Sequence, residues 1–294
     1  MTRPYAEVIG DPISHSKSPL IHNFWLKKLG IDAEYRACHV RPEELADYFA
    51  RRRGDAAWRG CNVTIPHKVQ AQAFVDSVEG YARRIGAINI VNRSLDGSLE
   101  GLNSDAAGFL EGLSKAEFLP QSQNHIATLF TVLGAGGAAR AVGTALEGAD
   151  ITFVNRTLSK AEQLADEFSA GAAYGYAQSL ADFLSDCNSE AEWEGIHKDD
   201  GRWPLVLVNT TSAGMVGQPE LPINLSNFPK DTIVYDIVYS PLETPLLREA
   251  KRCGLRTIDG LWMLIGQARI AFKEFFGDLP SKEYDAELRA LLIA

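Results

Sequence analysis

The sequence predicts an α/β fold in two domains, the second of which is built on a parallel sheet. A chain of 294 residues is long for one domain and suits two. Residues 126–133 form an apolar run that leads through a glycine-rich turn into the alanine-rich segment 137–146, which is the pattern of a buried strand followed by a helix. A second apolar strand at 151–154 completes a β-α-β unit of the expected length.

The turn in this unit has small residues at the positions that a dinucleotide site requires. Gly134, Gly136 and Ala139 allow a tight turn, close approach of the backbone to a pyrophosphate and close packing of the helix. The free amides at the helix N-terminus would bind that anion. Glycine-rich turns also occur as plain loops, but the β-α-β context favours a dinucleotide site. The predicted contacts are Gly134, Ala135, Gly136, Gly137 and Ala138.

The residues after the second strand indicate which dinucleotide binds. NAD sites usually place an Asp or Glu there to hold the ribose hydroxyls, whereas a 2′-phosphate needs donors and a cation. This chain has Asn155, Arg156 and Thr157, followed by Lys160, with no carboxylate among them. The sequence therefore predicts NADP(H) as cofactor. The simpler alternative is a polar strand end whose Arg156 is only solvated.

Composition argues against several kinds of partner. A net charge of −9 and a pI near 5.2 argue against a nucleic acid, whose phosphates need a basic face. The longest mostly apolar run, 126–142, is broken by glycines and Arg140, so we expect no membrane span. The chain shows no signal or transit pattern, and its cysteines have neither metal nor disulfide-framework spacing: Cys38, Cys61, Cys187 and Cys253. We expect a cytoplasmic protein with reduced thiols and no metal.

The first domain contains a pair of serines at a predicted helix start. Ser18 followed by Pro19 is typical of an N-cap with proline at the first helical position, and capping alone would explain it. Ser16 and Ser18 also lie two residues apart, so their hydroxyls and the helix dipole could together receive a small carboxylate.

Lys68 is a candidate proton donor. The short strand at 60–65 leads into a helix that we predict to begin at Pro66, which places Lys68 in the first turn, where the helix dipole disfavours a cation. Asn62 and Thr64 are its polar neighbours, and such a lysine is suited to proton transfer. The plainer alternative is a solvated lysine.

Asp105 lies where the first domain is predicted to end. Segments 88–92 and 98–102 form a predicted hairpin, and a helix follows at 106–113. The simplest role of Asp105 is that helix's N-cap. We place the domain boundary here, because the polar segment 121–124 and then the nucleotide-binding strand follow.

Polar residues follow a later strand of the second domain. The apolar strand 205–208 is followed by the loop 209–215, and strand exits line the ligand crevice of an open α/β sheet. Thr210, Ser212 and Met215 are therefore candidate cofactor contacts.

The rest of the chain carries fewer signals. A strand at 232–237 ends near Asp236, and the last long helix begins near 259–260. Gln267 in that helix is an amide among apolar neighbours, which is either hydrogen-bonded in the core or faces a ligand. The acidic stretch 185–203 is predicted to be an exposed insertion without assigned chemistry.

Together these stretches resemble the shikimate dehydrogenase family over nearly the whole chain. Several independent motifs occur in the right order: 16–19, 62–68, 86–89, 103–105, 134–140, 155–157 and 260–267. The resemblance implies reversible NADPH-linked reduction of 3-dehydroshikimate to shikimate. It also implies a substrate-binding domain at 1–105 with 263–294 packed on it, an NADP-binding Rossmann domain at 106–262, and a cleft that closes between them. It leaves open a monomer or a homodimer.

The resemblance also implies roles for individual residues. Ser16 and Ser18, helped by Thr64 and Tyr239, would hold the substrate carboxylate, and the ring hydroxyls would be bound by Asn62, Asn89, Asp105 and Gln267. Lys68 would protonate the alkoxide that forms at the C3 carbonyl, and Asp105 would position Lys68 and the substrate. Further cofactor contacts would come from Ile237, Gly260 and Met263.

The chain departs from the family pattern at Ile90, Ser104, Trp262 and the insertion 185–203. Ile90 and Ser104 replace usual threonines beside binding residues, which leaves quinate open as a second substrate. Three other classes compete: an NAD-linked quinate dehydrogenase, which would need an acid after Val154; a non-catalytic NADP sensor; and a metal hydrolase. The hydrolase would use His15, His22, His67 and Asp105, which lack the usual ligand spacing.

Overall fold

The computed structural model describes residues 3–118, 128–169, 174–188 and 205–294. The chain divides into two compact units, one made of Met1–Gly108 with Ile265–Ala294 and the other of Phe109–Leu264. Our expected boundaries were after 105 and before 263. The polar segment 121–124, the start of the predicted strand 126–133 and most of the insertion 185–203 lie outside the described residues.

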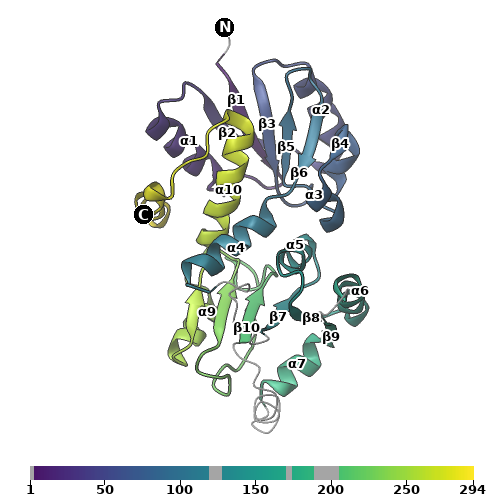
Figure 1. Cartoon of the computed structure of the whole chain (residues 1–294), viewed down its shortest axis with the longest axis vertical. Coiled ribbons are helices and arrows are strands. Elements are labelled where there is room, and N and C mark those ends of the chain that lie inside the picture. Colours follow the sequence, from purple (N-terminus) through teal and green to yellow (C-terminus); the bar gives the residue numbers. More distant parts are fainter. Residues whose placement is uncertain (1–2, 119–127, 170–173, 189–204) are drawn as a thin grey trace. The chain divides into compact units, whose positions relative to one another are not determined.

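The first unit contains a mixed six-stranded sheet with the strand order β2-β1-β3-β5-β6-β4 (Figure 1). β1 pairs in parallel with β2 and β3, β5 runs antiparallel to β3 and β6, and β4 pairs in parallel with β6. The strands are β1 (Tyr5–Gly10), β2 (Glu34–His39), β3 (Trp58–Val63), β4 (Ser77–Val78), β5 (Ile90–Arg93) and β6 (Leu99–Leu102). The predicted hairpin is the β5–β6 pair.

Helices cover both faces of this sheet. One face carries a core around Trp58 with Leu45, Tyr48 and Phe49, and the other packs Trp25 edge-on against Phe272. The helices are α1 (Ser18–Leu29), α2 (Leu45–Arg53), α3 (Gly80–Ile85) and α11 (Asp285–Ile293), with 3-10 turns at Pro42–Glu44, Gln70–Phe74 and Lys282–Tyr284. Two more helices, α4 (Asp105–Lys115) and α10 (Gly260–Phe276), carry the chain from one unit into the other.

The second unit contains a six-stranded sheet in which every pair is parallel. The strand order is β12-β11-β10-β7-β8-β9, so the first strand of the unit lies at the centre and the order reverses there. This is the doubly wound order of dinucleotide-binding sheets. The strands are β7 (Leu129–Leu133), β8 (Asp150–Asn155), β9 (Gly175–Ser179), β10 (Leu205–Asn209), β11 (Ile233–Asp236) and β12 (Arg256–Ile258).

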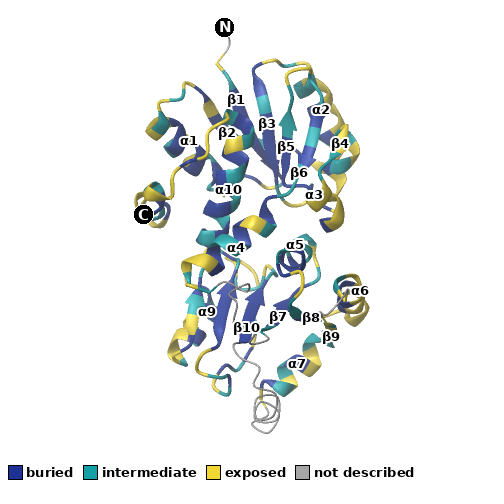
Figure 2. Cartoon of the chain, in the orientation of Figure 1, coloured by how far each residue is buried: buried dark blue, intermediate teal, exposed yellow. Residues whose placement is uncertain are grey.

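The apolar run of β10 is explained by cover on both faces. Val206 and Val208 contribute to the core on one face, and Leu205 and Leu207 to the core on the other. The helices of this unit are α5 (Gly137–Ala145), α6 (Leu158–Phe168), α7 (Leu180–Asp186) and α9 (Pro245–Arg252). Figure 2 shows the central strands of both sheets as buried. No helix in the described part of the chain is long and apolar enough to cross a membrane.

Gly260 is required by packing against the backbone. A Cβ at this position would lie 2.2 Å from the carbonyl oxygen of Ile237. Because a backbone atom cannot rotate away, we expect Gly260→Ala to lower the free energy of unfolding by about 3 kcal/mol, measured in urea. Gly80→Ala is the matched control, because a Cβ there meets nothing within 4 Å. Equal stability of the two variants would contradict this account.

Candidate active site

Lys68 lies in a turn after β3, and the helix that we predicted to begin at Pro66 is not formed. The reason is that tertiary hydrogen bonds take the carbonyl groups that a helix would use. The carbonyl of Ile65 accepts from Asp11 N at 3.1 Å, and that of Lys68 accepts from Ile88 N at 2.8 Å. The helix-dipole argument for Lys68 is therefore wrong, and its environment has another origin.

That environment is the carboxylate of Asp105. Lys68 Nζ lies 2.5 Å from Asp105 Oδ2, and the side chains are 26% and 8% exposed. Asp105 is the first residue of α4, and its backbone N–H donates to Asn103 Oδ1 at 2.8 Å. The N-cap interpretation of Asp105 is wrong, because its carboxylate faces Lys68 and Asn89 instead. This carboxylate holds the Lys68 ammonium group in one place, where it can donate a hydrogen bond to a bound ligand.

Asn89 fixes the other oxygen of this carboxylate. Its Nδ2 donates to Asp105 Oδ1 at 2.8 Å and to Ser104 Oγ at 3.1 Å, and its Oδ1 accepts from Ser104 N at 2.8 Å. Both amide hydrogens of Asn89 are thus in use. Ser104 supports Asn89 through its backbone and its hydroxyl.

Asn62 is oriented by a residue that sequence reasoning missed. The hydroxyl of Tyr35 donates to Asn62 Oδ1 at 2.6 Å, and Asn62 Nδ2 donates to Asn89 O at 3.2 Å. Tyr35 itself stacks on the ring of His22, with centroids 3.9 Å apart. A tyrosine in a short strand gave no signal of this role, because only the folded sheet brings β2 and β3 onto opposite sides of β1.

Ser16, Ser18 and Thr64 follow the carboxyl ends of two adjacent parallel strands, β1 and β3. Thr64 N donates to Ile9 O at 3.0 Å, which ties the two exits together. Helix α1 begins at Ser18 with Lys17 as N-cap, so our N-cap assignment for Ser18 is off by one residue. Instead, Ser16 Oγ accepts from Ser18 N at 3.3 Å.

Two predicted substrate contacts lie elsewhere. Gln267 is half-buried on α10 in the first unit, and Tyr239 follows β11 in the second unit. Burial raises the pKa of the Tyr239 hydroxyl, so it remains a neutral hydrogen-bond donor.

The glycine turn after β7 fits a pyrophosphate. Gly134 has a φ of 113°, and a Cβ there would lie 2.6 Å from Thr210 Oγ1. A Cβ on Gly136 would meet nothing within 4 Å, so protein packing does not require that glycine, whereas close approach by a ligand would. Helix α5 begins at Gly137 with no side-chain cap, which leaves the amides of its first turn for an anion.

The end of β8 fits a 2′-phosphate. Arg156, Thr157 and Lys160 are all exposed, and within the described ranges neither Arg156 nor Lys160 forms an ion pair. Asn155 Nδ2 donates to the carbonyl of Thr157 at 3.0 Å, which shapes the turn. By contrast, Arg140 on α5 is paired with Glu167. The two cations that follow β8 are therefore available to an anionic ligand.

A buried carboxylate lies at the end of β11. Asp236 is fully buried and accepts from Asn209 Nδ2 at 2.9 Å, Val238 N at 3.0 Å and Thr244 Oγ1 at 2.6 Å. Desolvation outweighs these hydrogen bonds and raises the pKa of Asp236 from 3.8 to about 6.

This raised pKa predicts a pH-dependent stability. The folded state binds the proton more tightly than the unfolded state, so its stabilising contribution is complete below about pH 4 and is lost as pH rises through about 6. Relative to Asp236→Asn, the wild type should lose at most about 3 kcal/mol of unfolding free energy over this range. Urea unfolding at a series of pH values measures it, and parallel curves for the two proteins would contradict it.

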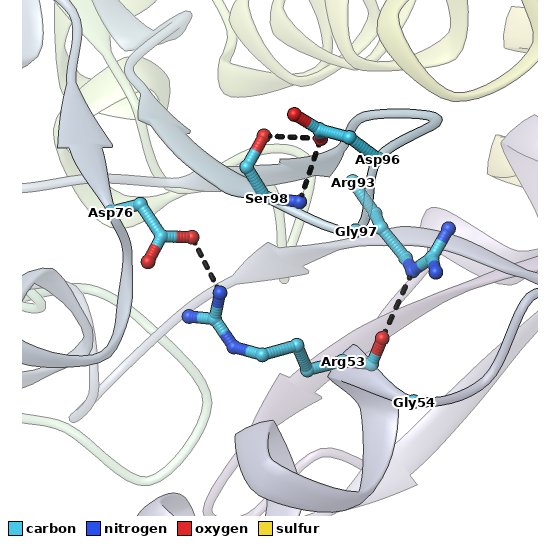
Figure 3. Close-up of a pocket in the computed structure, with 7 residues that line it drawn as sticks. All are labelled: Arg53, Gly54, Asp76, Arg93, Asp96, Gly97 and Ser98. Atoms are coloured by element: carbon cyan, nitrogen blue, oxygen red, sulfur yellow. Dashed lines mark hydrogen bonds and ion pairs between the residues drawn. The ribbon is translucent and has the colours of Figure 1, made fainter.

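A surface hollow in the first unit contains none of the predicted site residues (Figure 3). It is lined by Arg53, Gly54, Asp76, Arg93, Asp96, Gly97 and Ser98. Arg53 pairs with Asp76 at 2.5 Å, Arg93 donates to Arg53 O at 3.2 Å, and Asp96 accepts from Ser98. The charges here have internal partners, and the hollow has no assigned role.

The first unit has a mixed sheet and a Lys–Asp pair, and the second is a doubly wound unit whose glycine turn suits a phosphate. These two units define a two-domain protein of the dinucleotide-binding α/β class. Residues 8–91 match the family model described as shikimate dehydrogenase substrate binding domain. Shikimate dehydrogenase (NADP(+)) of Sphingopyxis alaskensis is 47% identical to this chain over an alignment of 300 positions. The alignment covers 99% of this chain and 97% of the relative. The chain belongs to the shikimate dehydrogenase family.

Solved structures agree with this family and confirm the predicted fold class. Shikimate 5-dehydrogenase from Thermus thermophilus, in complex with NADP(H) and shikimate, has a TM-score of 0.79 and 34% identity, covering 98% of this chain and 99% of that one. Quinate dehydrogenase from Corynebacterium glutamicum, in complex with NAD, has a TM-score of 0.79 and 26% identity, covering 98% and 99%.

Proposed function

We propose that this chain is an NADP-dependent shikimate dehydrogenase that reversibly reduces 3-dehydroshikimate to shikimate in aromatic amino acid biosynthesis. The observation that carries the proposal is the Lys68–Asp105 pair, with Nζ and Oδ2 2.5 Å apart beside Asn89. Reduction of a carbonyl leaves an alkoxide that needs an acid within reach. A 47% identical relative bears the same activity in its name.

Lys68 would donate its proton to the alkoxide oxygen in the reductive direction and accept it in the oxidative direction. NADPH supplies the hydride when bound. Asp105 would hold the ammonium group in position and accept a hydrogen bond from a ring hydroxyl. Asn89, which anchors Asp105 Oδ1, keeps that carboxylate from rotating.

Substrate binding would use the two strand exits of the first unit. Ser16, Ser18 and Thr64, with Tyr239, would hold the carboxylate. Asn62, Asn89 and Gln267 would bind ring hydroxyls. For this, Asn89 would exchange its 3.1 Å bond to Ser104 Oγ for one to the substrate, because its other amide hydrogen is held by Asp105.

The second unit would hold the cofactor. The glycine turn would bind the pyrophosphate, and Asn155, Arg156, Thr157 and Lys160 the 2′-phosphate. The remaining contacts would come from Thr210, Ser212, Met215, Ile237, Gly260 and Met263. On this basis 1–105 with 263–294 is the substrate domain and 106–262 the NADP domain.

Arg156→Ala should raise KM for NADP⁺ by roughly 10–100-fold, because a charge-assisted bond to the phosphate is lost. KM for NAD⁺ should change little, since NAD lacks that phosphate. The measurement is initial rate against each cofactor, with Arg248→Ala as the control for an exposed arginine on the same unit. An equal effect on both cofactors would contradict a phosphate-binding role.

The function is tested by assaying shikimate and quinate, each with NADP⁺ and NAD⁺, through the absorbance of the reduced nicotinamide. The proposal expects the shikimate–NADP⁺ combination to be the fastest. A comparable rate with quinate would support the alternative, a shikimate/quinate dehydrogenase of broader range, which the sequence leaves open through Ile90 and Ser104. No turnover with any combination, despite NADP⁺ binding, would indicate a sensor and overturn the proposal.

We also place the enzyme in the cytoplasm, as a monomer or homodimer. The cytoplasmic location is supported by its four free thiols, Cys38, Cys61, Cys187 and Cys253.

A further inference from the structure

Two loops that carry proposed ligand contacts share a single buried carboxylate. β10 and β11 are adjacent parallel strands, and Asn209 is paired with Asp236 at their carboxyl ends. The loop after β10 contains Thr210, Ser212 and Met215. The loop after β11 contains Ile237 and Tyr239. Whatever fixes Asn209 and Asp236 therefore fixes the first residues of both loops.

The amide of Asn209 is fully used in shaping its own loop. Its Oδ1 accepts from Thr211 N at 3.0 Å and Thr211 Oγ1 at 2.7 Å, while its Nδ2 donates to Ala213 O at 3.2 Å and to Asp236 Oδ1 at 2.9 Å. The first three bonds lie within residues 209–213. The bond to Asp236 anchors this amide to the neighbouring strand β11. Because Asp236 Oδ1 can only accept, the Asn209 side chain must turn its NH₂ group toward Asp236.

The same carboxylate shapes the second loop. Asp236 Oδ1 also accepts from Val238 N at 3.0 Å, and its Oδ2 accepts from Thr244 Oγ1, whose oxygen in turn accepts from Leu247 N at 3.2 Å to cap α9. Asp236 has no ion pair in the part of the chain that the structure describes. Burying a carboxylate without a cation costs free energy. Here that cost is offset by the hydrogen bonds that the carboxylate accepts, and these bonds order two loops and the start of α9.

We propose that Asp236 is a positioning residue for the cofactor, which acts by fixing the Asn209 amide and thereby the loop that bears Thr210, Ser212 and Met215. The inference rests on the proposed function, in which this loop contacts NADP(H). Asp236 touches no reacting atom in this account. Its effect is on cofactor affinity, through the shape of a loop at the end of β10.

The test is the dissociation constant of NADP⁺ by calorimetry, which needs no turnover. Asp236→Leu removes the acceptor and leaves buried donors unpaired, so affinity should weaken by roughly tenfold or more. Asp236→Asn keeps an acceptor oxygen for Asn209, so its NADP⁺ affinity should stay within about twofold of the wild-type value. Asn209→Ala breaks the same link from the other side and also removes the three bonds within the loop, so it should weaken affinity at least as much as Asp236→Leu, and the double variant should be little weaker than Asn209→Ala alone.

Thr244→Val is the matched control. It removes the partner of Oδ2 and the cap of α9 but leaves the bond between Asp236 and Asn209 intact, so it should lower thermal stability while NADP⁺ affinity stays within about twofold of wild type. Hydrogen exchange should rise at 209–215 in Asp236→Leu and not in Thr244→Val. These two differences separate positioning from general destabilisation.

Unchanged NADP⁺ affinity in folded Asp236→Leu or in Asn209→Ala would overturn the inference, as would an equal loss in Thr244→Val. If Asp236→Leu does not fold, Asp236→Ala, which also removes the acceptor, takes its place in the same comparison. Failure of the proposed function would be recognised by a different observation. In that case the wild type itself would not oxidise shikimate with NADP⁺, whatever the NADP⁺ affinities of these variants.

Discussion

Replacing Lys68 by alanine should lower kcat by about 10²–10⁴-fold while KM for shikimate changes little, because general acid–base catalysis is worth that factor. The expected loss follows from geometry: Lys68 Nζ is held 2.5 Å from a carboxylate that is 8% exposed, so the ammonium group is fixed at one place. Initial rates of shikimate oxidation with NADP⁺ measure it.

Lys28→Ala is the control for this variant. Lys28 also pairs with an acid, Glu287, at 2.6 Å, but both side chains are more exposed, at 34% and 58%. Its loss should leave kcat unchanged, because a surface ion pair contributes little. A Lys68→Ala enzyme with wild-type kcat would remove Lys68 from the mechanism.

Asp105→Asn should lower kcat by roughly 10²-fold or more, because the general acid loses the charge that positions it. The asparagine can still accept from Asn89, so the start of α4 should keep its structure. Since Lys68 and Asp105 act as one unit, the double variant Lys68→Ala with Asp105→Asn should be little slower than Lys68→Ala alone. Initial rates of the two single variants and the double variant, compared with the wild type, complete this double-mutant cycle.

Asp76→Asn is the matched carboxylate control. Asp76 pairs with Arg53 at 2.5 Å in the surface hollow of Figure 3, which contains no proposed site residue. Its replacement should leave kcat unchanged. Strictly multiplicative losses from Lys68→Ala and Asp105→Asn would show that the two residues act independently and would contradict the pair.

Features written in local sequence were predictable. The apolar run of β10 and the small residues around Gly134 indicated a buried parallel strand and a tight turn, and the structure has both, with Gly134 at a φ of 113°. These signals are local because burial on both faces and a positive φ each restrict the residue type directly. The fold class followed from them.

Features decided by distant partners were not predictable. The helix expected at Pro66 fails because Asp11 and Ile88 take the carbonyls that it needs, and no window around Pro66 contains those residues. The N-cap interpretation of Asp105 was wrong for a similar reason: its carboxylate pairs with Lys68, which lies 37 residues earlier in the chain. Local propensity was overridden by tertiary hydrogen bonds.

Some secondary-structure elements have only weak signals in the sequence. β12 has three residues, too few for any periodicity, so it was not predicted. By contrast, α9 begins with the pair Thr244 and Pro245, a cap followed by proline at the first helical position, and that signal could have located it. Tyr35 had no comparable signal, since its contact with Asn62 exists only once the sheet has formed.

The most direct measurement is a single-turnover reduction of 3-dehydroshikimate with enzyme in excess over NADPH, because it separates the chemical step from product release. We predict that the wild type consumes NADPH and forms shikimate, and that Lys68→Ala slows this chemical step by about 10²-fold or more. A chemical step of wild-type speed in Lys68→Ala, or no NADPH consumption by the wild type, would contradict the account.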